Sequence, residues 1–288
     1  MTDQPPPDIQ PPQPHPNAVT FDMPDGAWDT HFHVIDRSTG LVPDRSYTPH
    51  DAPLSQVHAL HAALGIDRRT FIQVSVHGTD NRAMMAALAA DGPDARGIAV
   101  VNDTVADAEL EAMHAAGVRG VRINVLFGGG VGFEFVERLA PRIAPLGWHM
   151  QFLIDVTAAD VPWPALERLP VPIVVDHMGL PAVETALADP GFRRMCALMR
   201  DGRCWVKLSG AERMSARERA PFDDVVPIAQ ALLDSGPQQC LWGTDWPHVK
   251  MLKAMPNDGD LLNQLAVWAP DPALRQAILV DNPARLYG

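Results

Sequence analysis

The stretch WDTHFHVID, residues 28–36, places two histidines, His31 and His33, inside a run that is otherwise mostly apolar or β-branched. Such a run predicts a buried strand over residues 27–34. Because side chains two apart on a strand face the same side, both imidazoles project from one face of this strand. The pair by itself is compatible with either a reactive site or two structural histidines. Other residues of the chain are needed to distinguish these two roles.

Similar β-rich runs recur along the chain, and a helical pattern follows each of them. We predict strands at residues 27–34, 69–76, 96–101, 118–125, 148–154, 171–177, 203–209 and 238–245. Strands that alternate with helices pair in parallel through right-handed crossovers. Eight such units in about 260 residues predict an α/β fold, a single-domain (β/α)8 TIM barrel. The alternative, an open doubly wound sheet, would usually place a glycine-rich phosphate turn after its first strand, and this chain has none there.

The first 26 residues are rich in proline and have neither helical nor strand periodicity. We predict that residues 1–26 form an extended arm over the surface, mobile at its start, and that residues 27–288 form the barrel domain.

Composition narrows the class of protein. Of the 288 residues 47% are hydrophobic, which is enough for a large core, and the net charge is -12. An acidic surface attracts neither nucleic acid nor anionic membranes. The three cysteines have no C-x-x-C spacing, and the chain has neither a signal segment nor an apolar run long enough for a transmembrane helix. These features predict a cytoplasmic enzyme whose partner is a small molecule, and they leave its oligomeric state open.

Polar side chains concentrate where the predicted strands end, which is where a TIM barrel places its active site. These candidates are His31 and His33, Ser75 and His77, Arg122 and Asn124, Asp176 and His177, Lys207 and Ser209 with Arg213 just beyond, and Asp245 and His248. Their joint placement on the first, sixth and eighth strands favours a catalytic site. Structural roles stay open for Ser75, Arg122 and Lys207, while His61 lies on a predicted helix and is expected at the surface.

Several motifs carry a resemblance to a known family. They are DTHFH at 29–33, VDHMG at 175–179, KLSG at 207–210 and LWGTDWPH at 241–248. Together they resemble the amidohydrolase superfamily, amidohydrolase-related family 2. The likeness runs from Gly26 to Tyr287, with YTP at 47–49, HGTDNRAM at 77–84, ERMS at 212–215 and VDNPARLY at 280–287. Within that family the chain resembles, more narrowly, the 2-pyrone-4,6-dicarboxylate lactonase group.

The resemblance implies a hydrolase that opens a carboxylated lactone. Asp245 matches the family's general base, which takes a proton from the attacking water. The cluster His31, His33 and His177 would donate hydrogen bonds to the developing oxyanion and orient the water. The side chains that match positions holding the substrate carboxylates are Tyr47, Ser75, Arg122 and Arg213. His77, Asn124 and His248 are further candidates for substrate binding.

The same central residues also suit a metal ion. His31, His33, His177 and Asp245 are ordinary zinc ligands. Many metal-dependent members of the superfamily take a further ligand from the fifth strand, but this chain has Leu153 near the end of that strand. His149 lies near its start, too deep to help. We therefore expect a site that requires no cofactor, with zinc as the alternative.

Two departures from the lactonase pattern concern the substrate. Gly128, in FGGGVG at 127–132, stands where the lactonases have a second arginine, and Leu153 stands where they have a tyrosine. We expect poor activity on 2-pyrone-4,6-dicarboxylate and better activity on a lactone with other acidic groups. Alternative activities are a lactone isomerase of the galactarolactone type and a zinc-dependent decarboxylase. A non-enzymatic binding barrel is disfavoured because the three histidines and the aspartate are all present.

Overall fold

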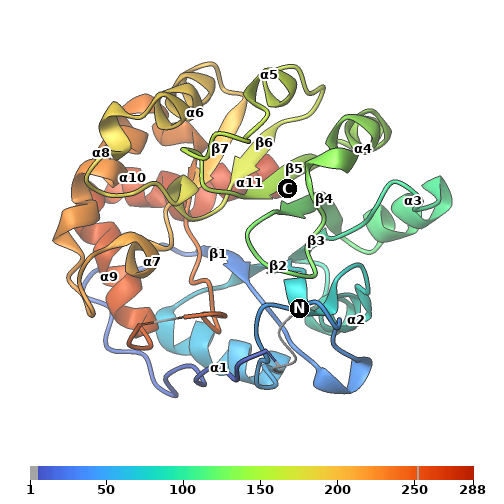
Figure 1. Ribbon diagram of the computed structural model, residues 1–288. Helices are drawn as coiled ribbons and strands as arrows, with labels where there is room; N and C mark the ends of the chain where they lie inside the picture. The colour runs from blue at the N-terminus through green and yellow to red at the C-terminus, as the bar shows by residue number, and fades with distance from the viewer. Residues whose placement is uncertain (1–5, 252) are drawn as a thin grey trace.

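The computed structural model describes residues 6–251 and 253–288, and in them the predicted TIM barrel is confirmed. A ring of parallel strands in chain order is surrounded by helices (Figure 1). The strands are β1 (Trp28–Phe32), β2 (Arg68–Ile72), β3 (Ala95–Ala99), β4 (Val118–Asn124), β5 (His149–Leu153), β6 (Ile173–Val175), β7 (Cys204–Lys207) and β8 (Cys240–Leu241).

Most of the helices pack outside the strands and bury an apolar face against them. They are α1 (Leu54–Leu64), α2 (Arg82–Asp91), α3 (Asp107–Ala115), α4 (Val136–Ile143), α5 (Trp163–Leu166), α6 (Pro190–Arg200), α7 (Ala211–Met214), α8 (Val226–Ser235), α9 (Asp258–Trp268), α10 (Pro272–Gln276) and α11 (Asn282–Tyr287). None of the helices in the described part of the chain is long and apolar enough to cross a membrane.

Most strands end earlier than their apolar runs predict. The carboxyl ends of these runs leave the sheet and form the loops at the barrel mouth. Ser75–His77 and His177–Gly179, for example, are single 3-10 turns that follow β2 and β6. The sequence pattern continues through these residues because they remain buried even after the ladder of backbone hydrogen bonds has ended.

The seam between the first and last strands is closed by a few backbone hydrogen bonds. The Thr30 amide donates to the Trp242 carbonyl at 3.1 Å, and the Asp245 amide donates to the His31 carbonyl at 2.7 Å. Gly243 allows this close approach, because a Cβ there would lie 2.6 Å from the His31 nitrogen. Closure therefore brings the first and eighth predicted site segments into direct contact.

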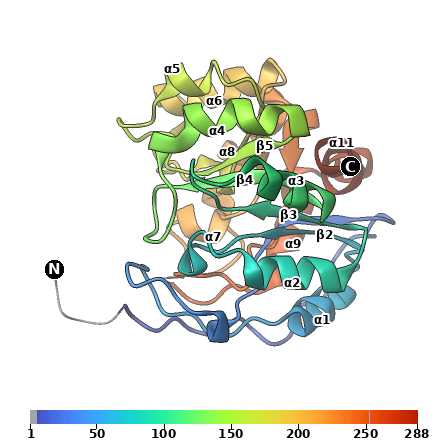
Figure 2. The same ribbon diagram turned by 90° about the vertical axis from the view of Figure 1, so that its right-hand side faces the viewer.

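The opposite end of the barrel is filled by side chains. Tyr287, from α11, packs there with Trp28 of β1 and other buried residues of the barrel interior. Figure 2 shows α11 and the C-terminus together at that end, so the loops that carry the candidate residues open at the other end.

The proline-rich arm is tied to the barrel over the residues that the structure describes. The Thr48 amide donates to the Pro7 carbonyl at 2.8 Å, which pairs the arm with the loop after β1. One face of α9 holds the next part, through side-chain bonds of Asn257, Asp260 and Asn263 to arm residues. The predicted mobile start falls on residues 1–5, outside the described residues.

Candidate active site

Three histidine rings converge on one carboxylate oxygen at the barrel mouth. The Nε2 atoms of His31, His33 and His177 lie 3.7, 3.9 and 3.6 Å from Oδ1 of Asp245. All four side chains are buried. The structure thus brings together, from β1 and the loops after β6 and β8, the residues that the sequence proposed as the centre.

The backbone of this centre is unusual. Asp245, His177 and His248 have positive φ angles of 63°, 53° and 59°. Residues other than glycine rarely adopt this region, and it costs conformational energy that the surrounding structure must offset. Such positions cluster at functional sites, so the backbone supports the same location as the side chains.

Arg213 determines how Asp245 is presented. Its Nε and Nη2 both donate to Oδ2 of Asp245, Nε at 2.7 Å, which leaves Oδ1 facing the histidines. Burial alone would raise the pKa of Asp245, but the Arg213 guanidinium holds it well below its ordinary value. Asp245 is therefore an ionised acceptor at neutral pH.

The histidines themselves are neutral. Burial lowers the pKa of His31 to about 4 and those of His33 and His177 to about 3. A neutral imidazole has one nitrogen that donates and one that accepts a hydrogen bond. The role of each ring in the centre therefore depends on the partner of its outer nitrogen, Nδ1.

His33 has an unambiguous partner. Its Nδ1 lies 2.8 Å from the carbonyl oxygen of Ile72, and a carbonyl can only accept, so Nδ1 carries the hydrogen. Nε2 of His33 then presents a lone pair to the centre. This tautomer favours orienting a water molecule over donating to an oxyanion. For His177, Nδ1 meets the Ser209 hydroxyl at 2.9 Å, which accommodates either tautomer.

Beneath His31 lies a buried network of charges. Asp176 receives a hydrogen bond from Arg122 Nε at 3.1 Å, and Lys207 Nζ lies 3.6 Å from its other oxygen. Burial alone would raise the pKa of Asp176, but the cations Lys207 and Arg122 keep it well below its ordinary value. Burial lowers the pKa of Lys207 to about 8. Arg122 thus has the acidic partner that the sequence left open, and it lies beside the centre.

Buried polar atoms around the centre lack hydrogen-bond partners within residues 6–251 and 253–288. Besides Nε2 of His31, these atoms are Tyr47 Oη, Ser75 Oγ, His77 Nε2, Asn124 Nδ2, both Glu212 carboxylate oxygens and His248 Nδ1. Native proteins rarely leave such groups unpaired, because burying them without a partner costs about 1–3 kcal/mol each. Their concentration at the mouth indicates a site that is completed by a ligand.

Sequence reasoning missed one acidic residue of this site. Glu212 is buried beside Arg213, with Oε1 at 3.7 Å from the guanidinium Nε, and burial raises the pKa of Glu212. Its position directly before Arg213, at the start of a short helix after the seventh strand, was the available signal. His248 lies nearby, and although burial lowers its pKa, Asp258 at 3.0 Å gives a net increase.

The prediction that His61 lies at the surface is wrong. This side chain is fully buried, and its Nε2 lies 3.0 Å from Oδ2 of Asp29. Asp29 also accepts hydrogen bonds from the His31 amide and from the Thr244 hydroxyl. His61 therefore supports the carboxylate that joins the first strand to the loop after the eighth.

His31, His33 and Asp245 lie close enough together to hold a cation, but the donor atoms fit a metal ion poorly. Metal ligands need lone pairs, and those of His33 and Asp245 are available. Lys207 Nζ lies 3.2 Å from Nδ1 of His31, and an ammonium group can only donate. Nε2 of His31 then carries a hydrogen and cannot ligate, so the set lacks one of its ligands.

A glycine-rich loop covers the mouth. The Gly128 amide donates to Ser46 Oγ at 2.7 Å, and a Cβ at Gly128 would lie 2.0 Å from the Asp44 carbonyl oxygen. No side chain fits there without moving this loop. Lys250 holds its ammonium 4.6 Å above the ring of Phe127, the first residue of the loop.

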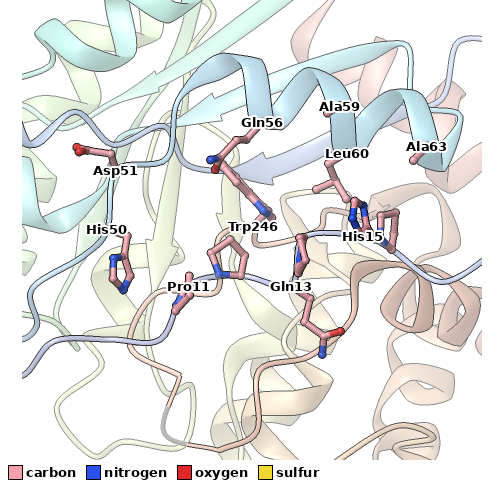
Figure 3. Close-up of a pocket in the computed structure, with 13 residues that line it drawn as sticks. Pro11, Gln13, His15, His50, Asp51, Gln56, Ala59, Leu60, Ala63 and Trp246 are labelled. Atoms are coloured by element: carbon pink, nitrogen blue, oxygen red, sulfur yellow. The ribbon is translucent and has the colours of Figure 1, made fainter.

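A cavity of about 450 Å³ lies elsewhere, between the arm and α1. Figure 3 shows Pro11, Gln13 and His15 on one side of it and Leu60 and Ala63 of α1 on the other. Of the loop after β8, Trp246 lines it, but none of the converging histidines does. The chemistry of the mouth, where reactive groups and unpaired atoms coincide, therefore identifies the site better than cavity size.

The fold and this cluster define the chain as a TIM-barrel protein with a histidine–aspartate centre at the carboxyl ends of its strands. The family model described as amidohydrolase matches residues 28–288. The chain therefore belongs to the amidohydrolase family, as its motifs indicated.

The chain is similar to three known proteins over nearly its whole length. A 2-pyrone-4,6-dicarboxylate hydrolase of Comamonas testosteroni is 40% identical, over 95% of this chain and 93% of the relative. A 4-sulfomuconolactone hydrolase of Hydrogenophaga intermedia is 37% identical, over 96% and 93%. A crystal structure from Agrobacterium tumefaciens superimposes with a TM-score of 0.83 at 27% identity, over 94% of this chain and 98% of that one.

Proposed function

We propose that this protein hydrolyses a lactone that carries acidic groups, with Asp245 as general base and without a metal ion. The observation that carries the proposal is the convergence of three neutral imidazoles on the ionised Asp245 carboxylate, beneath buried polar atoms that a ligand would satisfy. The similarity to two lactone hydrolases over nearly the whole chain supports the same reaction.

In the proposed reaction the lactone carbonyl lies among the histidines. Water, held by the lone pair of His33, gives a proton to Asp245 as its oxygen attacks the carbonyl carbon. His31 donates from Nε2 to the oxygen that becomes negative. The bond between the carbonyl carbon and the ring oxygen then breaks, and the ring oxygen takes the proton from Asp245. The product is the open-chain hydroxy acid or its tautomer.

The low pKa of Asp245 fits this scheme only if substrate changes its surroundings. A substrate carboxylate that binds Arg213 competes with Asp245 for the guanidinium. The carboxylate of Asp245 then becomes a stronger base once substrate is in place. Arg213 would thus serve both the anchoring and the chemistry.

Two residues near the barrel mouth favour a substrate other than a flat pyrone dicarboxylate. Gly128 has no room for a cationic side chain, and Leu153 is a buried apolar residue at the end of β5. Arg122 and Arg213 are the cations beside the centre that an acidic group could share with their aspartate partners, Asp176 and Asp245. We therefore propose low activity on 2-pyrone-4,6-dicarboxylate and higher activity on a lactone with differently placed acidic groups, which a screen of such lactones identifies.

The substitution Asp245→Asn tests the base, because it keeps the shape and removes the proton acceptor. General-base catalysis contributes about 10²–10⁴-fold, so kcat on the best lactone should fall at least about a hundredfold. Asp103→Asn, in a surface ion pair with Arg138, is the control and should leave kcat unchanged. Near-normal turnover by a folded Asp245→Asn protein would place the base elsewhere.

A lactone isomerase would use the same aspartate, with a substrate hydroxyl in place of water. Hydrolysis of the ester releases an acid, whereas isomerisation releases none. A pH-indicator assay on the same lactone therefore separates the two reactions.

A further inference from the structure

Lys207 is buried directly beneath the catalytic centre, yet the proposed reaction gives it no step. It lies on β7, and its side chain is fully buried. Its Nζ donates to the Thr30 carbonyl and to Oε1 of Gln151, both at 2.8 Å. The third contact is Nδ1 of His31 at 3.2 Å. An ammonium group has three hydrogens, so these three contacts account for all of them.

The contact with His31 has a definite direction. Since an ammonium group has no lone pair, Nδ1 of His31 must be the acceptor and carries no hydrogen. The hydrogen of the neutral ring then lies on Nε2, the atom that faces Asp245 Oδ1. His31 can therefore donate a hydrogen bond into the centre.

Asp176 is the competing partner. Its Oδ1 lies 3.1 Å from the same Nδ1 and would favour the opposite tautomer. In the described part of the chain, however, this oxygen forms no hydrogen bond. The negative charge of Asp176 is already balanced by Arg122, bonded to Oδ2, and by Lys207 at 3.6 Å. Lys207, rather than Asp176, is therefore the hydrogen-bond partner of His31 Nδ1 in the wild-type protein.

We propose that Lys207 is a positioning residue that fixes the tautomer of His31 and thereby keeps the site from binding a metal ion. His33, two residues away, is held in the opposite tautomer by the Ile72 carbonyl. The pair then supplies one donor, for the carbonyl oxygen, and one acceptor, for the water. The inference rests on the proposed function only for the use of these two groups; the tautomer can be measured without substrate.

Removal of Lys207 has a specific consequence. Nδ1 of His31 would then give its hydrogen bond to Asp176, and Nε2 would acquire a lone pair. Carboxylate–histidine pairs of this kind are common behind metal ligands, where they raise affinity by about 10–100-fold. His31, His33 and Asp245 would then all offer lone pairs, and the site would gain affinity for zinc.

The experiment compares the wild type with Lys207→Met, whose side chain has similar length and no charge. Two-bond ¹H–¹⁵N correlation spectra report the tautomer of His31, assigned by loss of its signals in His31→Gln. Wild type should show the hydrogen on Nε2, and Lys207→Met should show it on Nδ1. Titration with zinc chloride, after removal of all metal, should give at least about tenfold tighter binding in Lys207→Met.

Gln151→Met is the matched control. It removes a buried partner of both Lys207 and Asp176 Oδ2 but leaves the ammonium and Asp176 Oδ1 beside His31 Nδ1, so both the tautomer and the zinc affinity should stay as in the wild type. The proposal is overturned if wild-type His31 carries its hydrogen on Nδ1, a result that needs no variant to fold. Equal zinc affinity in wild type and a folded Lys207→Met would also overturn it. Neither readout depends on turnover, so failure here is distinct from failure of the Asp245 test.

Discussion

At the scale of single residues, we expect the Tyr47 hydroxyl to contribute to substrate binding and not to the stability of the fold. Its hydroxyl is buried and has no hydrogen-bond partner within the described ranges, and burial raises its pKa, so it remains a neutral donor. In Tyr47→Phe the KM for the lactone should rise about tenfold, the loss of one hydrogen bond. The free energy of unfolding should change little, because the hydroxyl forms no hydrogen bond with the described residues. Steady-state kinetics and urea unfolding measure the two quantities.

The control for this prediction is Tyr287→Phe. Tyr287 is also a buried tyrosine whose hydroxyl has no partner among the residues that the structure describes, but it lies at the closed end of the barrel. Its substitution should leave both KM and stability close to wild type. A loss of stability without a change in KM in Tyr47→Phe would assign the Tyr47 hydroxyl to the fold.

At the scale of elements, the loop at residues 127–132 depends on its glycines. Gly129 has a φ of +84°, and a Cβ there would lie 2.3 Å from the Ser75 carbonyl oxygen. Gly129→Ala should push the loop away from the mouth and lower kcat/KM at least about tenfold, since a displacement of about 1 Å can cost a hundredfold in rate. Kinetics of the purified variant, with a thermal melt, measures this effect.

The matched control is Gly92→Ala. Gly92 also has a positive φ, of +100°, but a Cβ there meets nothing within 4 Å. Alanine there also bears a backbone cost, about 1–3 kcal/mol, but at the end of α2 and away from the mouth. Equal kcat/KM in the two variants would mean that the position of this loop does not affect the reaction.

At the scale of the whole molecule, the buried neutral histidines predict sensitivity to acid. Burial lowers the pKa of His149 to about 3, beside the values of about 3 to 4 for His31, His33 and His177. The unfolded chain takes up protons below about pH 6.5, whereas the folded chain does not until about pH 3 to 4. The contribution of these histidines to the free energy of unfolding is therefore fully present above pH 6.5. It falls as the pH decreases, by about 1.4 kcal/mol per pH unit for each histidine.

Urea unfolding between pH 7.5 and 4.5 measures this dependence. The four histidines together should remove most of the free energy of unfolding of an ordinary domain, about 5–15 kcal/mol, before pH 4.5. His248, with its raised pKa, acts in the opposite direction but is a single group. A free energy of unfolding that stays constant from pH 6.5 to 4.5 would show that the four rings titrate normally.

The alternation of strands and helices was predictable because periodicity is a local property of the chain. In a parallel barrel all strands end at one face, so His31, Asp176 and Asp245 were expected to meet although they lie far apart in sequence. Strand lengths were overestimated because burial, which the pattern reports, continues into the loops after β2 and β6.

Other features depended on tertiary contacts. The pairing of Arg213 with Asp245 and of Arg122 with Asp176 follows from the register of the closed barrel, and no local pattern carries it. The burial of His61 depends on Asp29, which lies on a different element. The tautomers of His31 and His33 are set by single atoms of Lys207 and Ile72. Sequence patterns report which face of an element is buried, but hydrogen-bond partners depend on positions within about an ångström, which only the packed barrel defines.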